Sequence, residues 1–163
     1  MRLKQLHRTA AFAAVMMLVL ALLSSSAWAQ SKVSGTFKGN DKPATLTQVT
    51  AHKGEESGQS VTILVFSSKD QAGDAKADFD ALFGKFGDAI VAKVTPDGKV
   101  LSADLVHSNL DAPGGSIQTS GVLKMLDYKT ADGMISGHLT SGGSHEFHDL
   151  KWEVDLTFET KAP

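Results

Sequence analysis

An alternating run near the carboxyl end constrains the fold of this chain most. Between residues 150 and 159 the even positions are apolar and the odd positions are polar: Leu150, Trp152, Val154, Leu156 and Phe158 against Lys151, Glu153, Asp155, Thr157 and Glu159. Successive side chains of a β-strand point to opposite faces, so this alternation indicates a strand with one buried and one solvated face. We expect the other elements to pack on the even-numbered face.

The segment before this strand predicts its hairpin partner. Residues 133–140 carry apolar or small residues on one parity: Ile135, Gly137 and Leu139. The sequence Ser-Gly-Gly-Ser at 141–144 then has the conformational freedom to reverse the chain. A four-residue turn there sets Thr140 opposite His145 and keeps both apolar sets on one side.

The first 29 residues are typical of a cleavable secretory signal peptide. Basic residues precede an uncharged apolar run at 10–23, and the small-residue pattern Ala27-Trp28-Ala29 follows it. A retained signal anchor is the rival interpretation, but the apolar run is short for a bilayer span. No cysteine is present for lipid attachment. We therefore expect cleavage before Gln30, no membrane anchor afterwards, and a periplasmic or secreted protein.

Composition narrows the function classes. Residues 30–163 are long enough for one domain. Loss of residues 1–29 removes three basic and no acidic residues, which leaves 13 lysines and arginines against 18 acids, a net charge of −5. This acidic balance argues against nucleic acid as a partner. Without cysteine, the fold must be stabilised by burial and strand pairing.

The middle of the chain predicts one strand with two buried faces and a helix to cover it. Residues 61–66, Val-Thr-Ile-Leu-Val-Phe, are apolar on both parities, as a strand covered on both faces requires. After Asp74, a candidate N-cap, four apolar residues fall at helical spacing: Phe79, Leu82, Phe83 and Phe86. We expect an amphipathic helix that buries this stripe and closes one end or face of a β-structure.

Turn signals divide the rest into further strands. Short strands are expected around Phe37 and Val49, with turn chemistry at 39–43 and a solvated loop at 53–58. Pro96-Asp97-Gly98 joins a second hairpin of residues 89–107. Residues 117–128 read as one strand with a bulge near Gly121, and 130–133 as a turn. The prediction is a mainly β domain, an antiparallel barrel or sandwich of about eight strands with one helix.

The last hairpin holds the densest set of metal-capable side chains. His138, His145 and His148 lie there beside Glu146 and Asp149, and imidazole and carboxylate are suitable ligands for zinc or copper. In the expected register, however, the pentad 145–149 alternates between faces, and only His138 and His145 become diagonal neighbours. The alternative is that these are polar residues at a hairpin end, and no cofactor is predicted.

Two other histidines are candidates for a ligand site. His52 and His107 each end an expected strand, so both can point into the mouth of a β-structure. Phe79 and Phe83 on the covering helix would supply an apolar roof. The structural alternative for each histidine is a hydrogen bond to backbone or water.

Catalytic motifs are not found in the sequence. Neither a Gly-x-Ser-x-Gly elbow, a cysteine nucleophile, a spaced-glycine dinucleotide pattern nor a P-loop lysine occurs. Ser144 and His145 are neighbours, which on a strand face opposite sides and cannot pair as nucleophile and base.

The sequence therefore predicts an exported, non-catalytic binding protein. One version encloses a small hydrophobic ligand, and the other binds a protein partner through the surface or an edge strand. An enzyme of unfamiliar type with a site assembled from distant strands, or weak metal binding by the hairpin histidines, are the alternatives.

Overall fold

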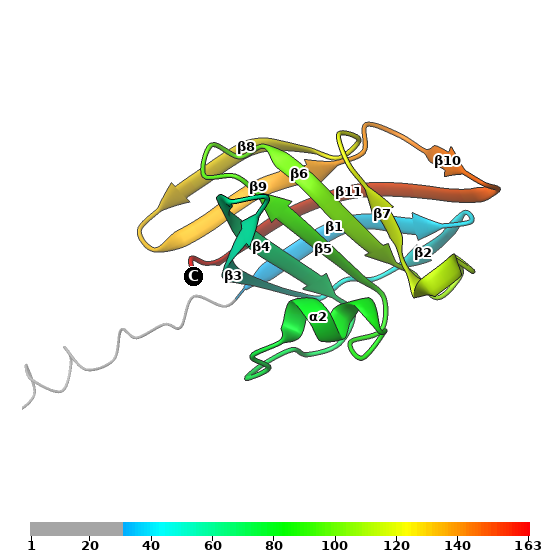
Figure 1. Cartoon of the computed structure of the whole chain (residues 1–163), viewed down its shortest axis with the longest axis horizontal. Coiled ribbons are helices and arrows are strands. Elements are labelled where there is room, and N and C mark those ends of the chain that lie inside the picture. The colour runs from blue at the N-terminus through cyan, green and yellow to red at the C-terminus, as the bar shows by residue number, and fades with distance from the viewer. Residues whose placement is uncertain (1–30) are drawn as a thin grey trace, which may run out of the picture. The chain divides into compact units, whose positions relative to one another are not determined.

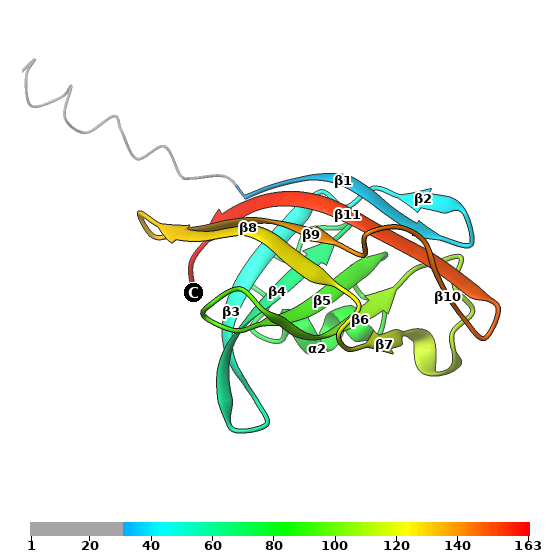
Figure 2. The same ribbon diagram turned by 90° about the horizontal axis from the view of Figure 1, so that it is seen from above.

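The computed structural model describes residues 31–163, which form two antiparallel sheets (Figure 1 and Figure 2). Sheet A has the order β2 (Lys42–Ala44), β1 (Lys32–Gly39), β11 (Leu150–Lys161), β9 (Met134–Thr140), β8 (Lys124–Ala131), with β10 (His145–Phe147) also paired to β11. Sheet B has the order β3 (Gln48–Glu56), β4 (Gln59–Ser67), β5 (Ala89–Val94), β6 (Val100–Val106), β7 (Ile117–Thr119). The helical segments within residues 31–163 are α2 (Ala77–Leu82) and the 3-10 turn η1 (Pro113–Gly115).

The prediction of a mainly β fold with antiparallel strands is confirmed, and the described part of the chain has one α-helix, which is short. The described residues contain eleven strands rather than about eight, and they form no closed barrel. The predicted signal peptide lies outside the described residues and stays a prediction. No helix within residues 31–163 has the length and apolar character needed to cross a bilayer.

The even-numbered face of β11 is buried, as its alternation predicts. Trp152, Val154, Leu156 and Phe158 are at most 4% exposed, and they share one core with side chains from sheet B. Phe158 meets Phe66 of β4 edge to face, with ring centroids 5.2 Å apart. The two sheets are therefore joined through the side chains of their inner faces.

Two-residue turns fix the register of four hairpins. Both turn residues have positive φ in Asn40-Asp41, Ser57-Gly58, Asp132-Gly133 and His148-Asp149. Each pair connects directly opposed strand residues, as the type I′ turn does. The predicted turns at 39–43 and 130–133 are confirmed. The predicted loop at 53–58 is wrong in extent, because β3 continues to Glu56.

The predicted register of the last hairpin is wrong. Thr140 pairs with Asp155, not His145, and the chain reverses at His148-Asp149 rather than at 141–144. Residues 141–144 instead form a bulge between β9 and β10, in which Ser141 N donates to Val154 O. Parity determines the buried face but not the offset along the strand. The true offset differs by an even number of residues, so the face prediction survives.

The single strand predicted for residues 117–128 is also wrong. β7 belongs to sheet B and β8 to sheet A, so the segment 120–123 crosses between the sheets. Leu123 lies in the shared core, which accounts for the mixed apolar parity. The irregular pairing is at Leu126 to Lys129, where Asp127 has φ 52°, and not at Gly121.

β4 is covered on both faces, as its sequence predicts. Leu64 and Phe66 point into the core between the sheets, whereas Val61, Ile63 and Val65 face a second cluster beneath α2. α2 packs on β4, β5 and β6 on the outer side of sheet B (Figure 1). The helix therefore covers one face of a single sheet and does not roof the space between the sheets.

Candidate ligand-binding cleft

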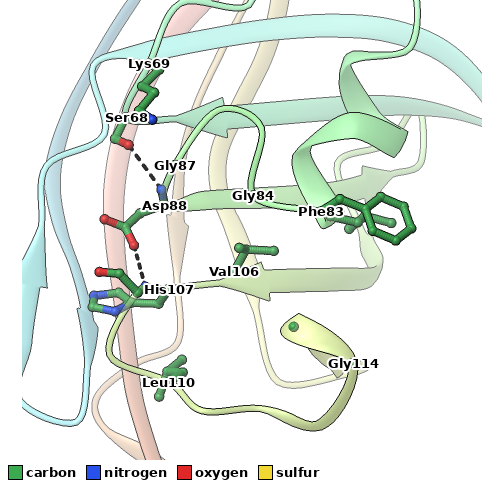
Figure 3. Close-up of a pocket in the computed structure, with 13 residues that line it drawn as sticks. Ser68, Lys69, Phe83, Gly84, Gly87, Asp88, Val106, His107, Leu110 and Gly114 are labelled. Atoms are coloured by element: carbon green, nitrogen blue, oxygen red, sulfur yellow. Dashed lines mark hydrogen bonds between the residues drawn. The ribbon is translucent and has the colours of Figure 1, made fainter.

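A cleft of about 610 Å³ lies where β4 and β6 end and β5 begins, between α2 and η1 (Figure 3). Its lining comes from α2, the end of β6, η1 and the segments that follow β4 and precede β5: Ser68, Lys69, Leu82, Phe83, Gly84, Gly87, Asp88, Val106, His107, Ser108, Leu110, Gly114 and Gly115. The volume falls in the range of small-molecule sites.

Helix α2 packs on sheet B through small residues and not through the predicted aromatic stripe. Ala77 and Ala81 are the buried residues of the helix, and Phe86 joins the same outer cluster after the helix has ended. Lys85 Nζ donates to carboxylate oxygens of Asp74 and Asp80 at 2.6 Å each. The Lys85 ammonium lowers the pKa of the Asp74 carboxyl. These bonds tie the segment after the helix to the segment before it.

The predicted burial of Phe79 and Phe83 is wrong. Phe79 is 57% exposed and Phe83 is 72% exposed, with ring centroids 4.9 Å apart. The helix buries Ala77 and Ala81, and Phe79, two residues from each, therefore lies on its opposite face. Phe83 follows Phe79 on that exposed face, and the helix has already ended at Leu82. Phe83 becomes one wall of the cleft, while Phe79 contacts Phe83 from outside the lining.

Hydrogen bonds hold the polar side of the cleft in place. Ser68 Oγ donates to Phe86 O at 3.2 Å and accepts from Asp88 N at 3.1 Å. Asp88 Oδ1 accepts from Ser108 N at 2.6 Å, which joins the start of β5 to the residues after β6 (Figure 3). The strand ends around the cleft are therefore fixed before any ligand binds.

His107 is buried at the side of the cleft, with 3% of its surface exposed. Its ring meets Phe37 edge to face at 4.8 Å and lies against Gly39, where a Cβ would come within 2.6 Å of Nδ1. Nδ1 accepts from Asn109 N at 3.0 Å, so the neutral ring carries its proton on Nε2. No atom of the described residues has hydrogen-bond geometry to Nε2, although the nearby Lys42 carbonyl favours the protonated ring.

Burial lowers the pKa of His107 below its usual 6.5, against the Asp88 charge and the Lys42 carbonyl, which raise it. At pH values between the pKa of His107 in the folded protein and its usual pKa of 6.5, this histidine binds a proton in the unfolded chain but not in the folded one. The free energy of unfolding should therefore fall as the pH drops through 6.5, and the loss should level off below the folded pKa. Urea unfolding curves recorded at several pH values from 7.5 to 5 measure this change in the free energy of unfolding.

His107→Gln should flatten this part of the profile, because it removes the buried group that titrates there. If the glutamine variant does not fold, an NMR titration of the wild-type His107 ring gives the same answer. Protonation of that ring at or above pH 6.5 would contradict the buried placement.

His52 lies on β3, away from the cleft lining. Its Nε2 is 2.9 Å from Thr50 Oγ1, and the Thr50 hydroxyl donates to Gln71 Oε1 at 2.8 Å. Gln71, itself buried, donates to Val65 O at 2.9 Å. The structure thus does not bring His52 and His107 to one site, and any ligand role of His52 stays a prediction.

The three histidines proposed as metal ligands lie apart in the observed register. His138 Nε2 is 2.6 Å from Asp155 Oδ1, and His145 pairs across from Trp152, with its Nε2 2.8 Å from Ser141 O. His148 forms part of the β10–β11 turn. The expected diagonal contact of His138 with His145 came from the wrong register. Within residues 31–163 no three metal-capable side chains gather at one point.

Most of the cleft residues were not singled out by the sequence. Ser68, Lys69 and Asp88 lie in segments flanking β4 and β5, and Val106 and Leu110 flank the predicted His107. The sequence did contain one signal for the cleft, the glycines of the adjacent loops. Without side chains, these residues leave backbone exposed at the cleft wall: Gly84, Gly87, Gly114 and Gly115.

No protein-family model, no curated protein and no solved structure matches this chain.

Proposed function

We propose that this chain is an exported β-sandwich protein that binds a small hydrophobic or amphipathic molecule in the cleft beside α2. The observation that carries the proposal is Phe83, a large aromatic side chain left 72% exposed at the wall of a cleft with an apolar floor. Exposed aromatic surface next to a preformed concavity is typical of a binding site.

The cleft supports a ligand on the outer side of sheet B rather than between the sheets. The inner core is filled by fully buried side chains such as Phe37, Phe66 and Leu139. Leu82, Val106 and Leu110 form the apolar part of the cleft. A molecule with an apolar body would cover these residues and the Phe83 ring together.

A protein partner is the second candidate. Phe147, on the three-residue edge strand β10, is 58% exposed above a smaller hollow of about 160 Å³ that also contains Trp152 and Ile117. The hollow is smaller than typical small-molecule sites, so the exposed Phe147 ring favours contact with a protein surface or strand edge instead. Export to the periplasm or beyond rests on the amino-terminal sequence alone. The proposal includes no catalytic step and no metal.

Fluorescence titration with N-phenyl-1-naphthylamine, an uncharged apolar probe, tests the small-ligand proposal. The wild-type protein should bind one equivalent, and Phe83→Ala should weaken binding three- to tenfold, about 0.7 to 1.4 kcal/mol, through loss of apolar contact. Isothermal calorimetry with the same probe gives an independent stoichiometry.

Phe147→Ala is the matched control, because it removes another exposed phenylalanine, on β10 of sheet A and outside the cleft lining. It should leave the titration unchanged. Absence of binding by the wild-type protein, or a larger loss in Phe147→Ala than in Phe83→Ala, would overturn the cleft as the binding site.

A further inference from the structure

The cleft has an apolar side and a polar side. Phe83 lies on one side of the view in Figure 3, and Ser68, Lys69 and Asp88 lie on the other. A purely apolar molecule would remove water from the polar groups without giving them new hydrogen bonds, and this desolvation would weaken binding. The arrangement favours a ligand with an apolar body and a polar head.

The polar groups differ in what remains available to a ligand. Ser68 Oγ is engaged with the backbone of Phe86 and Asp88, and Asp88 Oδ1 accepts from Ser108 N. None of the ion pairs within residues 31–163 includes Lys69. Asp88, the other charged residue of the lining, is in none of these ion pairs either, but its carboxylate already accepts from the backbone of Ser108. Within the described residues no hydrogen bond or ion pair involves the Lys69 ammonium, so this group remains available to a ligand.

The side chain of Lys69 lies beside Gly87, another residue of the cleft lining. A Cβ at Gly87 would lie 3.5 Å from Lys69 Cε and 3.7 Å from Lys69 Cγ, so the methylene groups run over the bare backbone of this glycine. Lys69 N donates to Phe86 O at 3.1 Å, which fixes where the side chain begins. Long lysine stems lie on apolar or backbone surface in this way while the ammonium stays hydrated.

We infer that the ligand is an amphipathic anion whose apolar body contacts Leu82, Phe83 and Val106 and whose carboxylate, or a similar head, pairs with Lys69. This inference rests on the proposed function of the cleft. An ammonium paired with a carboxylate forms a charge-assisted hydrogen bond. Because the pair is solvent-exposed, we expect a preference of three- to tenfold at low salt rather than an absolute requirement.

Three probes with the same chain test the head-group preference: decanoate, decan-1-ol and decyltrimethylammonium, each below its micelle concentration and each measured by calorimetry and by displacement of N-phenyl-1-naphthylamine. Decanoate should bind three- to tenfold more tightly than decanol, and the cation most weakly. Raising the salt concentration should narrow the gap, because ions screen exposed pairs.

Lys69→Gln should remove the preference for decanoate without changing decanol binding, and Lys69→Arg should restore it. Lys129→Gln, which removes another exposed lysine outside the cleft, should have no effect. Equal binding of decanoate and decanol, or a preference kept in Lys69→Gln, overturns this inference alone. Failure of all probes to bind the wild-type protein overturns the proposed function and the inference together.

Discussion

Trp152→Glu is expected to abolish stable folding. Trp152 is 4% exposed, lies in the core between the sheets, and stacks on His145 with ring centroids 5.1 Å apart. Truncating a buried tryptophan alone costs roughly 3 to 5 kcal/mol, and an unpaired buried carboxylate adds a desolvation penalty. That sum approaches the total stability of a typical domain, roughly 5 to 15 kcal/mol. Soluble yield and the urea unfolding transition measure the effect.

The neighbouring change Glu153→Gln should be nearly silent. Glu153 Oε2 pairs with Lys38 Nζ at 3.1 Å on the solvated face, and exposed pairs of this kind contribute about 0 to 1 kcal/mol. Similar losses of stability in the two variants would contradict the assignment of buried and solvated faces on β11.

Gly35→Ala should destabilise the protein by more than about 3 kcal/mol, the sum of backbone strain and overpacking. Gly35 pairs with Leu156 at φ +124°, and a Cβ there would lie 2.0 Å from the backbone oxygen of Asp155. The obstructing atom is backbone, so β1 would have to move away from β11. Thermal and urea unfolding measure the loss.

Gly143→Ala separates crowding from conformational strain. Gly143 has a similar φ of +133°, but a Cβ there would meet no atom within 4 Å. Its substitution should cost only the strain, about 1 to 3 kcal/mol. Equal losses at the two positions would show that β1 does not approach β11 as closely as described.

The strand content and the buried faces could be predicted because side-chain parity is local. The alternation in β11 and the two-faced apolar run of β4 each identify the side that must be covered, and both were correct. The turns predicted at 39–43 and 130–133 were correct because a two-residue turn also depends on local sequence, namely on two adjacent residues that can adopt positive φ.

Register and sheet membership could not be predicted, because they depend on pairing between distant residues. The offset of β9 on β11 was shifted by an even number of residues, which parity cannot detect. The passage from β7 to β8 also looked like one continuous strand, since residues that cross a core are as apolar as residues within a strand.

The candidate site was only partly accessible from sequence. His107 and Phe83 line the cleft, but His52 and Phe79 do not. The helical spacing of the phenylalanines suggested a buried stripe, whereas alanines make the contact with sheet B. The spacing of the phenylalanines identifies a common helix face but does not reveal whether that face or the alanine face packs on the sheet.

The most direct test of the binding cleft is a backbone amide NMR titration of residues 30–163 with N-phenyl-1-naphthylamine. Shifts concentrated at residues 68–69, 82–88, 106–110 and 114–115, with those of β8 and β10 unchanged, are the expected result. Shifts centred on β7 and β10, or none at saturating probe, would contradict ligand binding beside α2.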